Sequence, residues 1–152
     1  MRSKVPLVVA VLLSVTTIPL CAAGADDKSP DMQSIQALEA RANQAQPREQ
    51  CFLYAELVHK MTELSLRQYA AGDVDKATDM LKHVQQMAQK VHLSMADNDK
   101  RLKNAEILLS HTAFRLNEML HSSSFEDRSL VEATLTDVHQ AQNEAMLQVF
   151  RK

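Results

Sequence analysis

The sequence predicts an all-α fold: an up-down four-helix bundle with a short additional N-terminal helix. No residue after Gly72 is glycine or proline, so the main helix-breaking residues are missing from the second half of the chain. Apolar residues recur there at steps of three and four, the spacing that puts them on one side of a helix. The turns between these segments are short, and short turns place successive helices antiparallel.

The first two helices are predicted on either side of Pro47. Ser29 and Pro30 fit an N-cap and a first helical residue, and the apolar positions that follow are Met32, Ile35, Leu38, Ala42 and Ala45. A longer helix is expected from about Arg48 to Ala71. Gly72 should end it as a C-terminal cap.

Three further helices are predicted after Gly72. Asp73 is the expected N-cap of the first, which carries Val74, Ala77, Leu81, Val84, Ala88, Val91 and Met95. Asp97-Asn98-Asp99 should cap the second, which carries Leu102, Ala105, Leu109, Thr112, Leu116 and Met119. Ser124 and Asp127 have capping-box spacing before the third, which carries Val131, Leu135, Val138, Gln142, Ala145 and Val149.

A tetratricopeptide solenoid is the alternative fold, because the segment Gly72–Ala77 looks like a repeat turn. The expected helices are longer than the half-repeats of that family, and no self-similarity of about 34 residues is present. The bundle is therefore the favoured architecture.

The first residues predict a secretory signal peptide. Arg2 and Lys4 give a basic start, and the uncharged run 5–20 follows them. Ala23-Gly24-Ala25 then supplies small residues for cleavage. A membrane anchor is one alternative, but the run is shorter than the roughly 20 residues that a span needs. Lipid attachment at Cys21 is another, although the residues before it are not small.

These features predict three segments: a signal peptide at 1–25, a linker with the short leading helix at 26–47, and a helical bundle domain at 48–152. The 17 basic and 19 acidic residues are interspersed, so neither nucleic acid nor an anionic membrane is an implied partner, and no stable membrane insertion of the mature chain is expected. Cleavage would leave Cys51 as the last thiol, and a buried core position is its usual fate.

Metal chemistry is the main functional alternative. Met80, His83 and Met87 lie on one flank of a predicted helix, and thioether and imidazole ligands suit copper. The same methionines also fit a widened apolar core. A haem held by a methionine and a histidine would suit a redox bundle, but no pair is placed uniquely. Two Glu-x-x-His pairs, Glu56 with His59 and Glu118 with His121, match the di-iron spacing but lie away from the apolar sides.

Four apolar residues are expected to face outward. Ile107 and Phe114 lie opposite the apolar side of their helix, and Phe52 with Leu66 is a similar feature on the helix that starts near Arg48. The leading helix could cover one of these stripes. Alternatively, a protein or peptide partner, or a second copy of the chain, could dock there.

A family resemblance agrees with this fold. The segments Cys51–His59 and Arg101–Leu109, with Gly72-Asp73-Val74 between them, look similar to exported helical proteins of acidobacterial type. The resemblance implies a helical fold and export but no active site. The sequence thus favours a non-enzymatic, exported binding or structural module, periplasmic or extracellular, without a cofactor. A copper-binding or redox bundle is the alternative.

Overall fold

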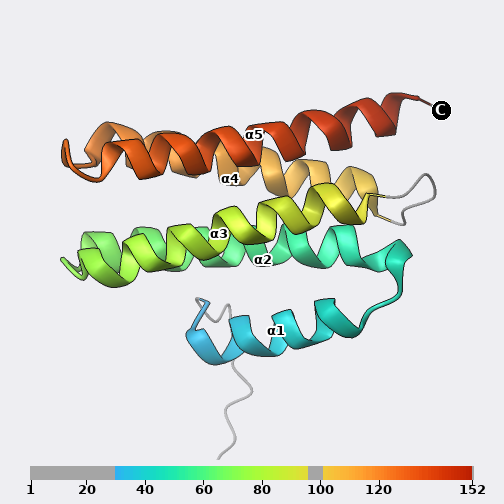
Figure 1. The fold of residues 1–152 in the computed structure, drawn as a ribbon, viewed down its shortest axis with the longest axis horizontal. Helices are drawn as coiled ribbons and strands as arrows, with labels where there is room; N and C mark the ends of the chain where they lie inside the picture. The colour runs from blue at the N-terminus through green and yellow to red at the C-terminus, as the bar shows by residue number, and fades with distance from the viewer. Residues whose placement is uncertain (1–29, 96–100, 152) are drawn as a thin grey trace, which may run out of the picture.

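The computed structural model describes residues 30–95 and 101–151, which form a helical bundle (Figure 1). The helices are α1 (Met32–Gln44), α2 (Pro47–Ala70), α3 (Val74–Ser94), α4 (Leu102–Ser122) and α5 (Arg128–Phe150). The four long helices α2 to α5 form the packed bundle, each running antiparallel to the helix that follows it in the chain, and α1 is a short addition. The predicted fold class is confirmed.

Two hairpins close the bundle. The α2–α3 hairpin lies against the α4–α5 hairpin, so that α2 packs on α4 and α3 packs on α5. The backbone of α1 lies against α2 (Figure 1). In the described part of the chain α4 does not pack against α3, so the four long helices form a closed bundle rather than a stacked solenoid. None of the described helices combines the length and the apolar character that a membrane span requires.

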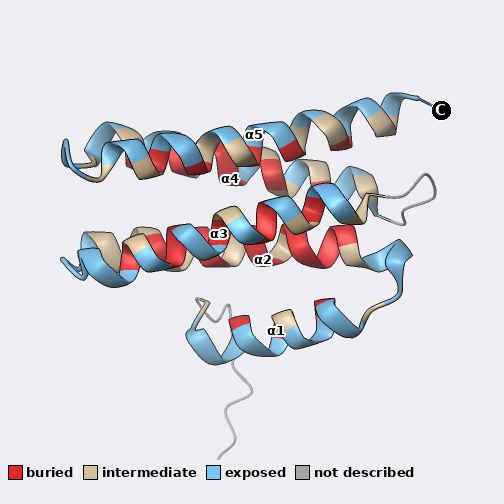
Figure 2. Cartoon of the chain, in the orientation of Figure 1, coloured by how far each residue is buried: buried red, intermediate tan, exposed pale blue. Residues whose placement is uncertain are grey.

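The core runs along the inner sides of α2 to α5, where the buried residues lie in Figure 2. The predicted apolar positions of α3 and α4 are buried except near the helix ends, and Cys51 is buried as expected. In α5 the buried residues are Val131, Thr134, Val138, Ala141 and Ala145. Leu135 and Gln142 are only partly buried. The buried side of α5 is therefore rotated from the predicted one, toward smaller residues.

The helix boundaries follow local capping chemistry. Gly72 adopts a positive φ of 84° and ends α2, as predicted. The Gly72 amide donates to the Tyr69 carbonyl and the Asp73 amide to the Gln68 carbonyl, which is a Schellman motif. The hydroxyl of Ser124 accepts from the Asp127 amide at 3.2 Å and donates to its carboxylate at 2.7 Å, so the two residues are in contact as predicted. The N-cap of α5 is Asp127 rather than Ser124, and no side-chain capping bond is made there.

The N-caps of α1 and α4 are Asp31 and Arg101. The N-cap of α1 is Asp31, whose carboxylate accepts from the Ser34 amide at 2.7 Å, and Pro30 precedes the helix instead of starting it. Ser29 and the predicted cap at 97–99 lie outside the described residues. The N-cap position of α4 is occupied by Arg101, which makes no side-chain capping bond.

A tyrosine joins the two hairpins at one end of the bundle. The Tyr69 hydroxyl, on α2, accepts from the Ser124 amide at 2.8 Å and donates to the Asp127 carboxylate at 3.3 Å. Both partners belong to the turn between α4 and α5. The last turn of α2 is therefore bonded directly to the turn of the other hairpin.

The first helix covers one side of α2. Ile35, Leu38 and Ala42 of α1 are buried. The Tyr54 hydroxyl of α2 donates to the Asn43 side chain at 2.9 Å, and Gln50 donates to the Ala42 carbonyl at 3.3 Å. These contacts show that the leading helix completes the fold against α2.

The covered side of α2 is not the one that holds Phe52 and Leu66. These residues lie seven positions on either side of His59, and His59 contacts Thr112 of α4. Phe52, His59 and Leu66 therefore share the side of α2 that packs on α4. Phe52 is buried and Leu66 partly buried, so the prediction that they face outward is wrong.

Candidate functional site

The three residues predicted as a copper site lie in different surroundings. Met80 and Met87 are 6% and 3% exposed and belong to the core, whereas His83 is exposed on α3. A shared ion needs the thioethers and the imidazole to converge. Met80 and Met87 are core residues of α3 and His83 lies on its exposed side, so the copper site stays a prediction.

The two Glu-x-x-His pairs also diverge. Glu56 accepts from Arg41 of α1 at 3.4 Å, and the Glu118 carboxylate pairs with Arg115. His59 points toward α4, and the His121 ring contacts the Asn117 carbonyl at 2.7 Å. Within residues 30–95 and 101–151, no group of three or more histidine, cysteine or carboxylate side chains is arranged to hold a metal ion.

The surroundings of His59 favour the neutral imidazole. The Thr112 hydroxyl donates to the Leu108 carbonyl at 2.8 Å, so its oxygen accepts from Nδ1 of His59 at 3.1 Å. Burial lowers the pKa of His59. The neighbouring charge of Glu63 opposes this shift, and further cationic neighbours add to it: His111, Lys60 and Arg115.

The lowered pKa of His59 predicts acid sensitivity. Unfolded, the imidazole has a pKa of about 6.5, so the unfolded chain binds this proton more readily than the folded chain does. The His59 contribution to stability should be complete above that pH and be lost as the pH falls toward the lower folded pKa. Urea unfolding at a series of pH values measures this loss.

The control for His59 is a matched pair of substitutions. His59→Gln keeps a neutral hydrogen-bond donor and should flatten the stability profile below about pH 6.5. His83→Gln, at an exposed position, should leave the profile unchanged. Equal acid sensitivity in wild type and His59→Gln would contradict the assignment.

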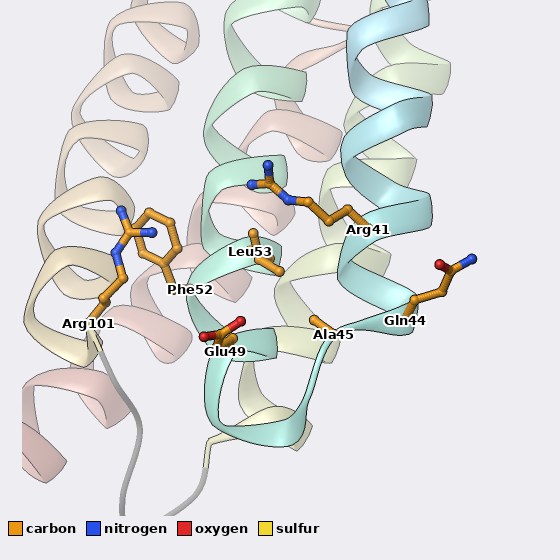
Figure 3. Close-up of a pocket in the computed structure, with 7 residues that line it drawn as sticks. All are labelled: Arg41, Gln44, Ala45, Glu49, Phe52, Leu53 and Arg101. Carbon is orange, nitrogen blue, oxygen red and sulfur yellow. The ribbon is translucent and has the colours of Figure 1, made fainter.

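A cleft opens where three helix ends meet. It has a volume of about 440 Å³ and lies between the last turn of α1, the first turns of α2 and the start of α4 (Figure 3). This volume is in the range of small-molecule sites. Its lining combines apolar and charged side chains: Arg41, Gln44, Ala45, Glu49, Phe52, Leu53 and Arg101.

Arg101 covers the aromatic side chain of this cleft. Its guanidinium carbon lies 3.4 Å from the centre of the Phe52 ring, a cation–π contact that leaves the N–H edges of the fork available. Phe52 is only 7% exposed, and the contact with Arg101 contributes to its burial on the side of α2 that packs on α4. In the described part of the chain, no carboxylate forms an ion pair with Arg101.

The backbone of Arg101 is strained. Its φ of 66° makes it the one residue other than glycine with a positive φ among those described. The left-handed conformation costs a residue with a Cβ atom about 1–2 kcal/mol. Arg101 has both the strained backbone and the contact with the Phe52 ring. Local packing therefore holds an arginine in a backbone conformation that only glycine adopts without strain.

Arg41 approaches the cleft from α1. One N–H group of Arg41 donates to Glu56 at 3.4 Å, and Figure 3 shows its guanidinium extending past Leu53 toward the side that holds Arg101. Glu49 supplies the carboxylate of the lining. Glu49 and Glu56 offset the two arginines in charge, and Arg101 is the arginine of the lining that has no ion-pair partner among the described residues.

The sequence points to two residues of this cleft, Ala45 and Phe52, but as apolar positions and not as parts of a site. Arg41 and Glu49 lie on α1 and α2, and Arg101 is the N-cap residue of α4, so nothing in their local spacing indicates that they meet. The feature of the sequence that could have drawn attention to this region is Arg101 itself. The helix after it starts without a serine, threonine, aspartate or asparagine in the cap position.

The predicted outward residues of α4 are exposed. Ile107 is 42% and Phe114 62% exposed, so α1 does not cover them. The apolar residues with still greater exposure, which sequence reasoning did not single out, are Leu93, Phe125 and Phe150. They lie near helix ends or in the α4–α5 turn, where helical periodicity gives no information.

Comparisons with known proteins give no relative for this chain: no family model, curated protein or solved structure matches it. The resemblance to exported helical proteins of acidobacterial type therefore stays a prediction.

Proposed function

We propose that the chain is an exported helical binding module that acts by docking a partner at the cleft between α1, α2 and α4, without catalysing a reaction. The cleft carries this proposal. Its lining lies on α1 and α2 and at two residues that directly adjoin a helix, Ala45 and Arg101, and rigid elements position binding groups more accurately than loops do.

The residue types of the cleft support binding. Arginine and aromatic side chains dominate the energetics of protein interfaces, and Arg101 on Phe52 combines them. Arg41 adds a second cation, and Ala45 and Leu53 add apolar surface. This mixture can hold the polar end and the apolar end of one ligand at the same time.

Export is the second part of the proposal, and it rests on the sequence at 1–25. A soluble mature chain starting near Asp26 is expected in the periplasmic or extracellular fraction. Intact-mass measurement of the exported protein tests this start. A mass that retains the leader, or that includes lipid on Cys21, would contradict it.

A photo-crosslinking residue placed in the cleft tests the docking site. Gln44 is exposed and lines the cleft, so a photoreactive side chain at this position should give a discrete adduct in producing cells. The same residue at Gln86, exposed on α3, is the matched control and should give none. A defined adduct from position 44, including one with a second copy, supports the proposal, whereas no adduct or equal adducts would refute it.

A further inference from the structure

We infer that the cleft recognises a carboxylate attached to an apolar or aromatic body; this inference rests on the proposed function and names the ligand of that site. Two sources offer this chemistry: a free carboxylic acid, and the C-terminus of a peptide that ends in an apolar residue. The charge, the floor and the size of the cleft each support it.

An arginine of the lining that has no carboxylate partner among the described residues selects an anion. Arg41 pairs with Glu56 of α2, whereas Arg101 makes no ion pair with a described carboxylate, so one ligand carboxylate would supply that partner. Arg101 stacks on Phe52 through its flat face, which leaves N–H groups in the guanidinium plane to donate to a carboxylate. A more highly charged anion would meet stronger repulsion from Glu49.

The floor of the cleft selects an apolar body beside that carboxylate. Phe52 and Leu53 are buried beneath the charged groups, and Ala45 is partly buried at the edge. Figure 3 shows these side chains among the two arginines and Glu49. A cleft of about 440 Å³ accepts an aromatic or branched aliphatic group together with its carboxylate.

The absence of tryptophan from the sequence makes binding directly measurable. N-acetyltryptophan carries one carboxylate and one aromatic ring, and its indole fluorescence can be read against a protein without tryptophan. N-acetyltryptophanamide is the neutral probe of nearly the same shape. The full mature protein should bind the acid and discriminate against the amide by about tenfold or more, because a hydrogen bond to a charged group is lost.

Three substitutions in the cleft have expected effects of different sign. Arg101→Gly and Arg41→Gln should each weaken binding of the acid by about ten- to a hundredfold. Glu49→Gln should strengthen it, because the opposing carboxylate is removed. Arg128→Gln, at the other end of the bundle, is the matched control and should bind like the wild type.

Thermal unfolding separates a lost ligand contact from a lost fold. Arg101→Gly relaxes the positive φ and should keep or raise the melting temperature while binding falls. Equal binding of acid and amide, or wild-type affinity in both arginine variants, would overturn the inference. An adduct from position 44 that N-acetyltryptophan does not reduce would overturn this inference alone, whereas loss of all position-specific adducts would overturn the proposed function.

A peptide arm distinguishes the two sources. A pentapeptide ending in tryptophan with a free carboxylate is compared with its C-terminal amide and with N-acetyltryptophan. Tighter binding of the free-acid peptide than of the amino acid supports a peptide C-terminus, and equal or weaker binding supports a free carboxylic acid. If the amidated peptide binds as tightly as its free acid, carboxylate recognition is refuted.

Discussion

Leu109→Ala should lower the free energy of unfolding by about 2–5 kcal/mol, which is a large part of the stability of a single domain. Leu109 is 0% exposed and lies in the middle of the buried side of α4, where the surrounding helices cannot close the space that the truncation leaves. Urea unfolding followed by circular dichroism at 222 nm, the usual helical band, measures the loss.

The control for Leu109 lies two residues away on the same helix. Ile107 is 42% exposed, so Ile107→Ala removes little buried surface and should cost well under half as much. Similar losses at both positions would mean that Ile107 is covered in solution. A second copy on the outer face of α4 would then be indicated, and a concentration dependence of the unfolding midpoint would reveal it.

Ile35→Asp should detach α1 from the bundle. Ile35 is 1% exposed against α2, and a buried carboxylate without a partner costs more than the small contact area of α1 can offset. The variant should be cleaved rapidly near residues 45–47, between α1 and α2. Its melting temperature should be lower than that of the wild type. Limited proteolysis with mass spectrometry locates the cleavage.

Met32→Asp is the matched control for Ile35→Asp. Met32 is one turn earlier on α1 and 47% exposed, so the same charge there remains hydrated. Met32→Asp should resist protease like the wild type. If the α1–α2 connection of Ile35→Asp stays protected from protease, burial of Ile35 is not what holds α1 against α2.

The fold could be predicted because one rule applies along most of the chain. Without glycine or proline after Gly72, the spacing of apolar residues sets both the helices and their buried sides, as at Leu109 and Leu116. The buried side of α5 was harder to place, because Thr134 and Ala141 are small and compete poorly with Leu135 in a hydrophobicity pattern. The buried side of α5 is rotated toward these small residues because they let α5 approach its neighbouring helices closely.

The candidate site could not be predicted, because it depends on contacts between helices. Phe52 lies away from the side of α2 on which the spacing of apolar residues predicts the core, and only the position of α4 shows that this side is covered as well. α2 packs against α1, α3 and α4, so its buried residues extend over most of its surface. A pattern with a single apolar side fits a helix that packs on one side only. α2 packs against three helices, so such a pattern identifies only part of its buried surface.

The bonds of Tyr69 bear on how the bundle can deform. They fasten α2 to the α4–α5 turn at the end of the bundle opposite the cleft. If one hairpin rotates against the other about this end, atoms close to Tyr69 move little. Atoms at the opposite end of the bundle, where the cleft lies, move most. The width of the cleft should therefore respond to small changes in the angle between the hairpins, and a ligand that draws Arg41 and Arg101 together would reduce that angle.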